Sequence, residues 1–157
     1  PYNIARRIAS LDVLSGGRAG WNVVTATGGG ENFNLVSHVD HALRYERAHE
    51  FVDVVKGLWK STETEAFIRD KHTGVWLDPS RVHPLNHKGR FFQVAGPLNA
   101  PPPIQHPPIL AQAGASGAGK ELAARIGEVI YTAEYDIDAA RASRADGLER
   151  AARYGRD

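Results

Sequence analysis

ILAQAGASGAGKELAARIG, residues 109–127, joins a short apolar run directly to an Ala-rich helical pattern through a turn of small residues. The run that begins one residue earlier, PILAQAG at residues 108–114, is typical of a strand buried on both faces of a parallel sheet. The pattern over residues 120–126 predicts a helix. A strand that passes through a tight turn into a helix is the repeating unit of α/β proteins, so this stretch decides the fold class.

The turn itself, residues 114–117, has two explanations that the spacing leaves open. One is local, because glycines permit a tight connection between strand and helix. The other is an anion site, because a strand that ends just before a helix aims several free backbone N–H groups at one point, where the helix dipole favours negative charge. Gly114 and Gly117 would let a phosphate approach, and the Ser116 hydroxyl would add a donor. A glycine pattern alone is weak evidence for either.

The N-terminal part of the chain predicts a helix followed by a strand. Apolar residues recur at helical spacing up to residue 14, Asn3 is the expected cap, and the glycines at residues 16 and 17 end the pattern. GWNVVTA, residues 20–26, predicts a short strand buried on both faces. The glycines at residues 28–30 then predict a flexible loop.

A long helix is expected next. Ser37 is the expected cap of an apolar stripe that ends at Trp59. Thr62 and Glu65 resemble a capping box, which predicts a second, short helix over residues 63–69.

The second half of the chain predicts a long irregular segment and then a return to regular structure. Residues 70–108 alternate short apolar pieces with Gly, Asn and Pro, which predicts one or two hairpins and a proline-rich extended segment. Segments of this length are more often lids or binding loops than connectors. EVIYTA, residues 128–133, predicts a third strand, and residues 138–154 predict the last helix. The order of elements indicates an α/β fold with parallel strands.

The composition narrows the class of protein. The chain has 157 residues, of which 42% are hydrophobic and 24% charged, as in an ordinary soluble globular domain. A net charge of +1 gives no field that would draw nucleic acid or an anionic membrane, so neither is expected as a partner. The absence of cysteine excludes disulfides, thiolate metal sites and a Cys nucleophile, and favours a cytoplasmic location. No apolar run approaches the roughly 20 residues that span a bilayer. The start, without methionine, looks like the interior of a longer protein.

Three polar residues outside the turn are further candidates for ligand contacts. Asn22 and Thr25 lie near the end of the first strand, where α/β proteins place ligand-contacting groups. Alternatively, Asn22 caps a loop and Thr25 only ends the strand. Tyr45 either points its phenol into the same site or is an ordinary exposed helix residue, and the spacing decides neither case.

A metal site is the weaker interpretation of the polar residues before the long helix. His38, Asp40 and His41 include ligand types that zinc prefers, but no second cluster has a matching spacing. Polar residues are also common at helix starts. We therefore expect no metal.

Four blocks of the sequence together resemble the bacterial-luciferase-like flavin-dependent monooxygenases. They are LDVLSGGRAGWNVVT (11–25), RYERAHEFVDVVKGLW (44–59), DKHTGVWLDPSRVHPLNHKGRFFQVAGPLN (70–99) and ILAQAGASGAGKELAARIGEVIYTA (109–133). The similarity is to the branch with nitrilotriacetate, dibenzothiophene-sulfone and long-chain-alkane monooxygenases. It covers essentially the whole chain, with the blocks in family order.

The resemblance implies that the chain is part of a TIM (β/α)8 barrel. Residues 1–157 would form a partial barrel domain, about strands four to six with their helices, because a complete barrel takes about 250 residues. Residues 1–69 would supply a helix, a strand and the long helix. Residues 70–108 would be an insertion that roofs the active site, and residues 109–157 would be a strand–helix–strand–helix unit with a phosphate-binding turn.

The resemblance also implies a reaction. Family members bind reduced FMN supplied by a separate NAD(P)H-dependent flavin reductase, and they activate O2 as a C4a-peroxyflavin that oxygenates a small organic substrate. The implied cofactor-binding residues are a set of seven: Asn22, Thr25, Tyr45, Gly114, Ala115, Ser116 and Gly117. The first two would lie beside the isoalloxazine and ribityl chain, and the others would hold the phosphate. No catalytic acid or base is implied within this chain.

Two departures and two alternatives accompany the resemblance. Ala26 stands where relatives often have Ser or His, and NAPPPIQHPP (99–108) differs from the usual arginine- and glutamine-containing stretch. A deazaflavin-dependent oxidoreductase is one alternative, although the nitrilotriacetate-like blocks argue against it. A non-catalytic flavin-binding or interaction fragment is the other. Three strands from the middle of a closed sheet leave two unpaired edges. If this is the whole chain, oligomerisation or poor stability should follow, whereas in a longer enzyme other strands would cover the edges. A homo-oligomer is the expected state.

Overall fold

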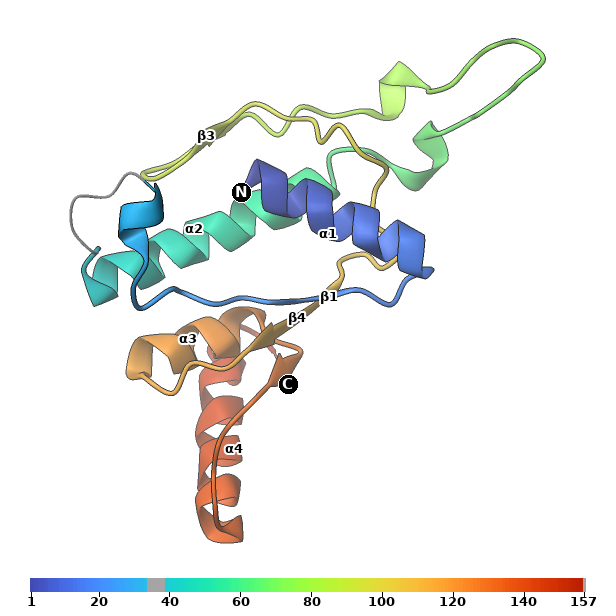
Figure 1. Cartoon of the computed structure of the whole chain (residues 1–157). Coiled ribbons are helices and arrows are strands. Elements are labelled where there is room, and N and C mark those ends of the chain that lie inside the picture. Colours follow the sequence, from blue (N-terminus) through green and yellow to red (C-terminus); the bar gives the residue numbers. More distant parts are fainter. Residues whose placement is uncertain (34–38, 157) are drawn as a thin grey trace. The chain divides into compact units, whose positions relative to one another are not determined.

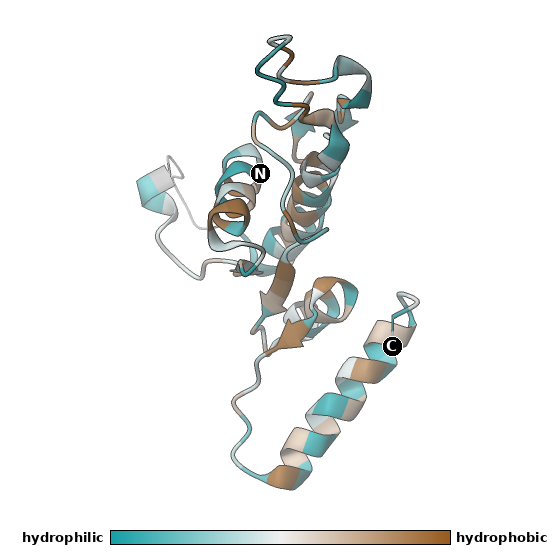
Figure 2. Ribbon diagram, turned by 90° about the vertical axis from the view of Figure 1, so that its right-hand side faces the viewer, coloured by the Kyte–Doolittle hydropathy of each residue, from teal (hydrophilic) through white to brown (hydrophobic). Residues whose placement is uncertain are grey.

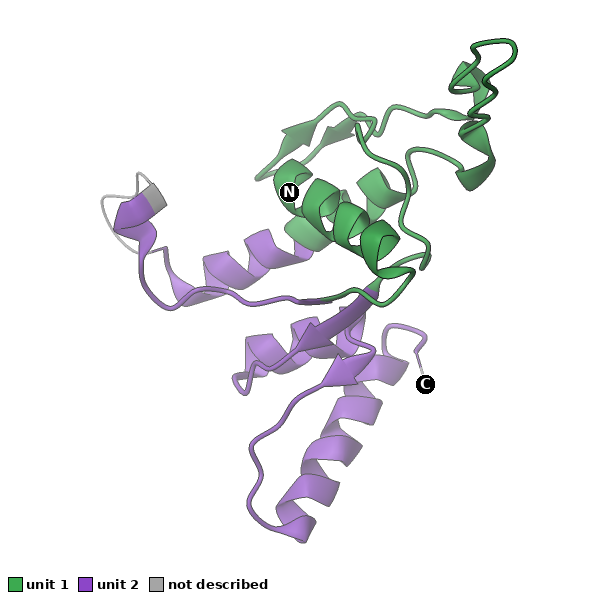
Figure 3. Ribbon diagram, turned by 45° about the vertical axis from the view of Figure 1, so that its right-hand side comes forward, with its two compact units in different colours: residues 1–20, 50–108 green, residues 21–49, 109–157 purple. Residues whose placement is uncertain are grey.

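The computed structural model describes residues 1–33 and 39–156, which divide into two compact units (Figure 3). Unit 1 is formed by Pro1–Gly20 with Glu50–Pro108, and unit 2 by Trp21–His49 with Ile109–Asp157. The long helix α2 (His41–Trp59) contributes its first part to unit 2 and its second part to unit 1. The turn at residues 114–117 therefore belongs to unit 2.

Apart from its first residue, Gly20, a three-stranded sheet belongs to unit 2. Its strands are β1 (Gly20–Asn22), β4 (Ile109–Gln112) and β5 (Val129–Ile130), in the order β1-β4-β5; Figure 1 labels β1 and β4. Strand β4 pairs in parallel with β5. Backbone hydrogen bonds extend the ladder beyond the strands, from Val23 N to Ala111 O at 2.9 Å and from Tyr131 N to Gln112 O at 3.0 Å. The predicted α/β class with a parallel sheet is confirmed.

Two helices complete the C-terminal part of unit 2. Helix α3 (Gly117–Ile126) begins three residues earlier than predicted, and α4 (Ile137–Ala152) agrees with the prediction within two residues at each end. The apolar residues of this part gather on the strands and α3, whereas most of α4 is hydrophilic or neutral (Figure 2). The side chains of α3 that pack inward are Leu122, Ala123, Ala124 and Ile126. The Asp136 carboxylate caps α4 by accepting from two backbone amides at its start.

The first strand differs from its prediction. It has three residues rather than seven, and its neighbours Val23 and Val24 are 4% and 68% exposed. Successive side chains of a strand point to opposite faces of the sheet. The described residues cover the face on which Val23 lies and leave the face of Val24 exposed. The expectation of burial on both faces is wrong for this strand.

Helix α2 begins at His41, with Asp40 as its cap. The Asp40 carboxylate accepts from Ala42 N at 2.9 Å and Leu43 N at 3.3 Å. These backbone hydrogen bonds, that of Leu43 first, lower the pKa of Asp40. The predicted cap, Ser37, lies outside the described residues, and a 3-10 turn over Gly30–Phe33 precedes them.

Unit 1 begins with α1 (Tyr2–Ser15), whose cap is Pro1. The Pro1 carbonyl accepts the first helical hydrogen bond, from Ala5 N at 2.9 Å, so the predicted cap Asn3 is wrong and lies inside the helix. Gly16 ends α1 in the left-handed conformation, with φ 68°, which glycine adopts without steric cost.

The segment between α2 and β4 contains little regular structure, as predicted. Strands β2 (His87–Lys88) and β3 (Gln93–Val94) form an antiparallel hairpin, and single 3-10 turns cover Thr64–Ala66 and Pro79–Arg81. The helix predicted over residues 63–69 is therefore wrong. Thr62 is buried and pairs with Val82 in an isolated bridge, so it caps no helix.

Two buried polar contacts hold unit 1 together. Trp59, 2% exposed, donates its indole N–H to Ala5 O at 2.9 Å and so joins α2 to α1. The fully buried Asp12 carboxylate accepts from Ala19 N at 3.2 Å, Gln105 N at 2.9 Å and Gln105 Nε2 at 2.6 Å. Asp12 thereby fixes the path of the unusual proline-rich segment before β4.

Candidate phosphate-binding site

The turn after β4 is capped by Ser116. This residue has the extended backbone of a helix N-cap, and its Oγ accepts from Gly119 N at 3.1 Å. Within residues 1–33 and 39–156, the amides of Gly117 and Ala118 donate to no acceptor. Two free N–H groups therefore stand at the positive end of the α3 dipole, next to a hydroxyl.

The glycines of the turn serve different purposes. A Cβ on Gly119 would lie 2.8 Å from Gly114 Cα, and one on Gly114 would lie 2.9 Å from Gly119 Cα. These two backbones touch, so both positions require glycine. A Cβ on Gly117 would meet nothing within 4 Å. Sequence reasoning missed Gly119, although the pair of glycines five residues apart on either side of the turn was a signal for it.

This difference predicts opposite effects for two alanine substitutions. Gly119→Ala should lower the free energy of unfolding by about 1–3 kcal/mol, because the new methyl group overlaps the Gly114 backbone. Gly117→Ala should be neutral or raise it by about 0.4–1 kcal/mol, because alanine restricts the unfolded chain more than glycine does. Urea unfolding of both variants measures this, and the reverse order would contradict the packing described here.

Tyr45 lies on the part of α2 that belongs to unit 2 and is 8% exposed. Its ring packs at a tilt against His41, with 4.9 Å between ring centroids. No described residue shares a hydrogen bond with its hydroxyl. Further along α2, His49 Nδ1 lies 3.1 Å from Arg125 Nη1 of α3, which connects the two helices within the unit. Among the described residues, none therefore occupies the Tyr45 hydroxyl.

Asn22 and Thr25 lie at and just beyond the end of β1, the strand next to β4. Asn22 is exposed and Thr25 is half-buried. The backbone after them is tied to α2, because the Arg44 guanidinium donates to Ala26 O. All seven predicted cofactor-binding residues fall in unit 2.

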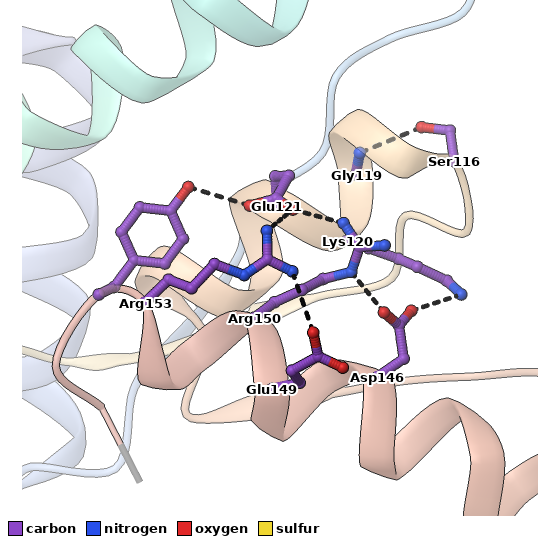
Figure 4. A network of polar contacts seen from close by, with 9 residues as sticks. Ser116, Gly119, Lys120, Glu121, Asp146, Glu149, Arg150 and Arg153 are labelled. Atoms are coloured by element: carbon purple, nitrogen blue, oxygen red, sulfur yellow. Dashed lines mark hydrogen bonds and ion pairs between the residues drawn. The ribbon is translucent and has the colours of Figure 1, made fainter.

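A network of charged side chains joins the first turn of α3 to α4 (Figure 4). Lys120 Nζ and Arg150 Nε contact the two Asp146 oxygens at 3.0 Å and 2.7 Å, and Arg150 Nη1 contacts Glu121. Hydrogen bonds from Lys120 and Arg150 lower the pKa of Asp146. Burial acts to raise the pKa of Glu121, but hydrogen bonds from Arg150 and Tyr154 outweigh it and lower that pKa. Both carboxylates are therefore ionised at neutral pH.

Sequence reasoning named none of these charged residues. Asp146 and Arg150 are four residues apart in a helical pattern, which is the spacing of a helical ion pair and was a usable signal. Their contacts with α3 join residues far apart in the sequence, so spacing could not reveal them.

The residues considered as metal ligands have other contacts. Asp40 caps α2, His41 packs against Tyr45, and His38 lies outside the described residues. Among the residues that the structure describes, no three His, Asp or Glu side chains converge as ligands of an ion. Likewise, no described helix combines the length and apolar character that crossing a membrane requires.

The family model described as luciferase-like monooxygenase matches residues 1–157. The chain belongs to the luciferase-like monooxygenase family. It is 52% identical to N-acetyl-S-(2-succino)cysteine monooxygenase of Bacillus subtilis strain 168 over 159 residues, which cover 100% of this chain and 36% of that protein. It is 48% identical to nitrilotriacetate monooxygenase component A of Aminobacter aminovorans over 158 residues, which cover 99% and 35%.

Solved structures match all or nearly all of the chain. The crystal structure of a long-chain alkane monooxygenase has a TM-score of 0.95 at 39% identity and covers 100% of this chain and 37% of that one. A riboflavin lyase solved with modified FMN and riboflavin has a TM-score of 0.91 at 39% identity, covering 99% and 35%. The resemblance to the nitrilotriacetate and alkane branch is confirmed, and so is the fold as part of this barrel family.

The luciferase-like relatives are much longer than this chain, which spans 36% and 35% of the two relatives named above. Its numbering within a barrel, strands four to six, stays a prediction. The same holds for the roles of the seven predicted site residues.

Proposed function

We propose that the chain is the FMN-phosphate-binding part of a monooxygenase that uses reduced FMN and O2 to oxygenate a small organic substrate. The observation that carries the proposal is the Ser116-capped turn after β4, beside which two amides donate to none of the described residues. Relatives named as monooxygenases and a neighbour solved with modified FMN support it.

The residues of the turn fit a phosphate. Ser116 offers its hydroxyl proton, because its Oγ lone pair is what Gly119 N uses. The amides of Gly117 and Ala118 add two donors along the α3 dipole, and no Cβ at Gly117 narrows the approach. In this proposal Tyr45 supplies a fourth donor through its hydroxyl.

The other predicted residues complete the proposed cofactor site. Gly114 and Ala115 shape the turn through their backbone, while Asn22 and Thr25 contact the ring and ribityl chain from the end of β1. When bound, reduced FMN supplies the electrons that activate O2. The part of this chain is to hold the phosphate, orient the ring and exclude water.

The proposal extends to the surroundings of the site. Residues 70–108 would roof the active site, and the partial barrel domain would comprise strands four to six of a complete barrel. A separate flavin reductase would supply reduced FMN. We further propose that the complete protein is a homo-oligomer and lies in the cytoplasm. The absence of cysteine supports the proposed location.

Oxygen consumption by the complete polypeptide that carries this chain tests the function. Reduced FMN, generated by an added flavin reductase, should support consumption of O2 when a candidate substrate such as an aminopolycarboxylate is present. Reduced deazaflavin should give no hydride transfer. Hydride transfer with deazaflavin and no oxygenation with FMN would replace the proposal with an oxidoreductase of the same barrel class.

A further inference from the structure

We propose that Arg150 and Asp146 of α4 are positioning residues that hold the phosphate turn in its binding geometry. The inference rests on the proposed function, because it concerns the same turn. It assigns a role to two side chains that touch α3 and do not reach the turn themselves.

The turn and the first turn of α3 behave as one piece. Gly114 and Gly119 are in backbone contact, so the end of the strand segment cannot shift against the helix without a clash or a gap. Ser116 Oγ accepts from Gly119 N at 3.1 Å, which adds a second link between the two. Any movement of residues 119–121 therefore moves the donors of Ser116 and Gly117.

That first turn is held by α4 through charges (Figure 4). Asp146 receives Lys120 Nζ at 3.0 Å and Arg150 Nε at 2.7 Å, while Arg150 reaches Glu121 through its other arm. The side chains of Arg150, Asp146 and Glu121 are only 23%, 31% and 30% exposed. An isolated surface pair contributes little, but an arginine that bridges two carboxylates in a network fixes direction as well as distance.

Apolar packing contributes little on the side of α4, because none of its residues is buried. Gly114 and Ala115 line an open pocket of about 730 Å³ within unit 2, together with residues from the middle of α4. Lys120 and Asp146 are part of its lining, together with apolar residues such as Leu148. With no residue of α4 buried, the salt-bridge network sets how far the start of α3 lies from α4.

Among the described residues, Arg150 contacts two carboxylates of the protein itself, so in this proposal its guanidinium acts on a ligand through α3. Losing it would leave α3 in place, because Leu122, Ala123 and Ile126 remain packed. It would let the first turn of α3 rotate and shift. The donors at Ser116, Gly117 and Ala118 would then no longer point toward a single phosphate position.

Arg150→Gln in the complete polypeptide tests this, with FMN and riboflavin titrated side by side. The Kd for FMN should rise about tenfold, roughly the loss of one charge-assisted hydrogen bond, and the Kd for riboflavin should stay within about twofold. Backbone amides at residues 114–119 should exchange with solvent faster. If Arg150→Gln does not fold, Asp146→Asn takes its place with the same expectations.

Arg153→Gln is the matched control. It removes the same charge at the C-cap of α4, but Arg153 is 55% exposed and its Nη1 lies 3.6 Å from Glu121, so the phosphate turn should keep its geometry. FMN affinity should then match that of the unaltered protein. An equal loss in both variants would overturn the inference in favour of bulk charge, and so would equal weakening of FMN and riboflavin.

The two proposals fail in different ways. If the unaltered protein binds FMN and riboflavin equally, the phosphate site itself is refuted, and the inference falls with it. If it prefers FMN and Arg150→Gln leaves that preference unchanged, only the positioning role is refuted.

Discussion

Ser116→Asp should lower the affinity for FMN at least about 100-fold while leaving α3 folded. Aspartate caps helices as well as serine does, so its carboxylate can accept from Gly119 N as Ser116 Oγ now does. The hydroxyl donor, however, is replaced by a negative charge. Two unit charges about 4 Å apart near a protein surface repel by about 4 kcal/mol. This energy exceeds the roughly 2.7 kcal/mol that corresponds to a 100-fold loss of affinity.

Three comparisons make this result specific to the phosphate. Riboflavin, which lacks the phosphate, should bind Ser116→Asp and the unaltered protein with similar affinity in a fluorescence-quenching titration. Ser116→Thr keeps both the cap and the hydroxyl, so it should bind FMN normally. Circular dichroism should give all three proteins the same melting temperature within a few degrees. Undiminished FMN binding by a folded Ser116→Asp protein would refute the turn as the phosphate site.

The periodic elements of the fold were predictable from the sequence. The apolar stripe that ends at Trp59 placed α2, and the order of strand and helix patterns gave the parallel α/β class. These signals are local, because the period of buried side chains is set by the geometry of the element itself. The hairpin of β2 and β3 was likewise predicted, from the Gly, Asn and Pro residues that alternate with short apolar pieces over residues 70–108.

Element ends and burial were less predictable. Asn3 and Thr62 are both good capping residues, yet Pro1 precedes α1, and Thr62 is used in a bridge to Val82. Which polar group satisfies a free amide depends on what the rest of the chain brings near it. The exposure of Val24 was unpredictable for a similar reason. A run of β-favouring residues has the same sequence pattern whether the rest of the protein covers one face of the strand or both.

The candidate site likewise has some features that the sequence predicts and others that only the folded chain reveals. Ser116 as a cap follows from its position before a helical pattern, whereas the contact of Gly114 with Gly119 depends on how tightly the turn closes. The bridges from α4 to α3 join residues 26 and 29 positions apart, and only the folded chain brings them together. The family resemblance named the turn but carried no information on what holds it.

Asp12→Ala should lower the free energy of unfolding by about 2–4 kcal/mol. The substitution removes the acceptor of three donors: Ala19 N is buried, and a buried donor without a partner costs about 1–3 kcal/mol, while the two half-buried Gln105 donors add less. Gln105 supplies two of them, so the proline-rich segment before β4 should loosen first. Urea unfolding gives the energy, and proteolysis near residue 105 should become faster.

The same carboxylate makes this loss depend on pH. Burial acts to raise the pKa of Asp12, but hydrogen bonds from the side chain and backbone of Gln105 and from Ala19 outweigh it, so the pKa is lowered. A lowered pKa in the folded state gives stability that is complete above the unfolded value of about 3.9 and is lost as pH falls through the folded value. The difference in unfolding free energy between the unaltered protein and Asp12→Ala should therefore be constant from about pH 5 to 7 and narrow below about pH 4. A difference that does not narrow would mean that the ionised form of Asp12 is not what Ala19 and Gln105 stabilise.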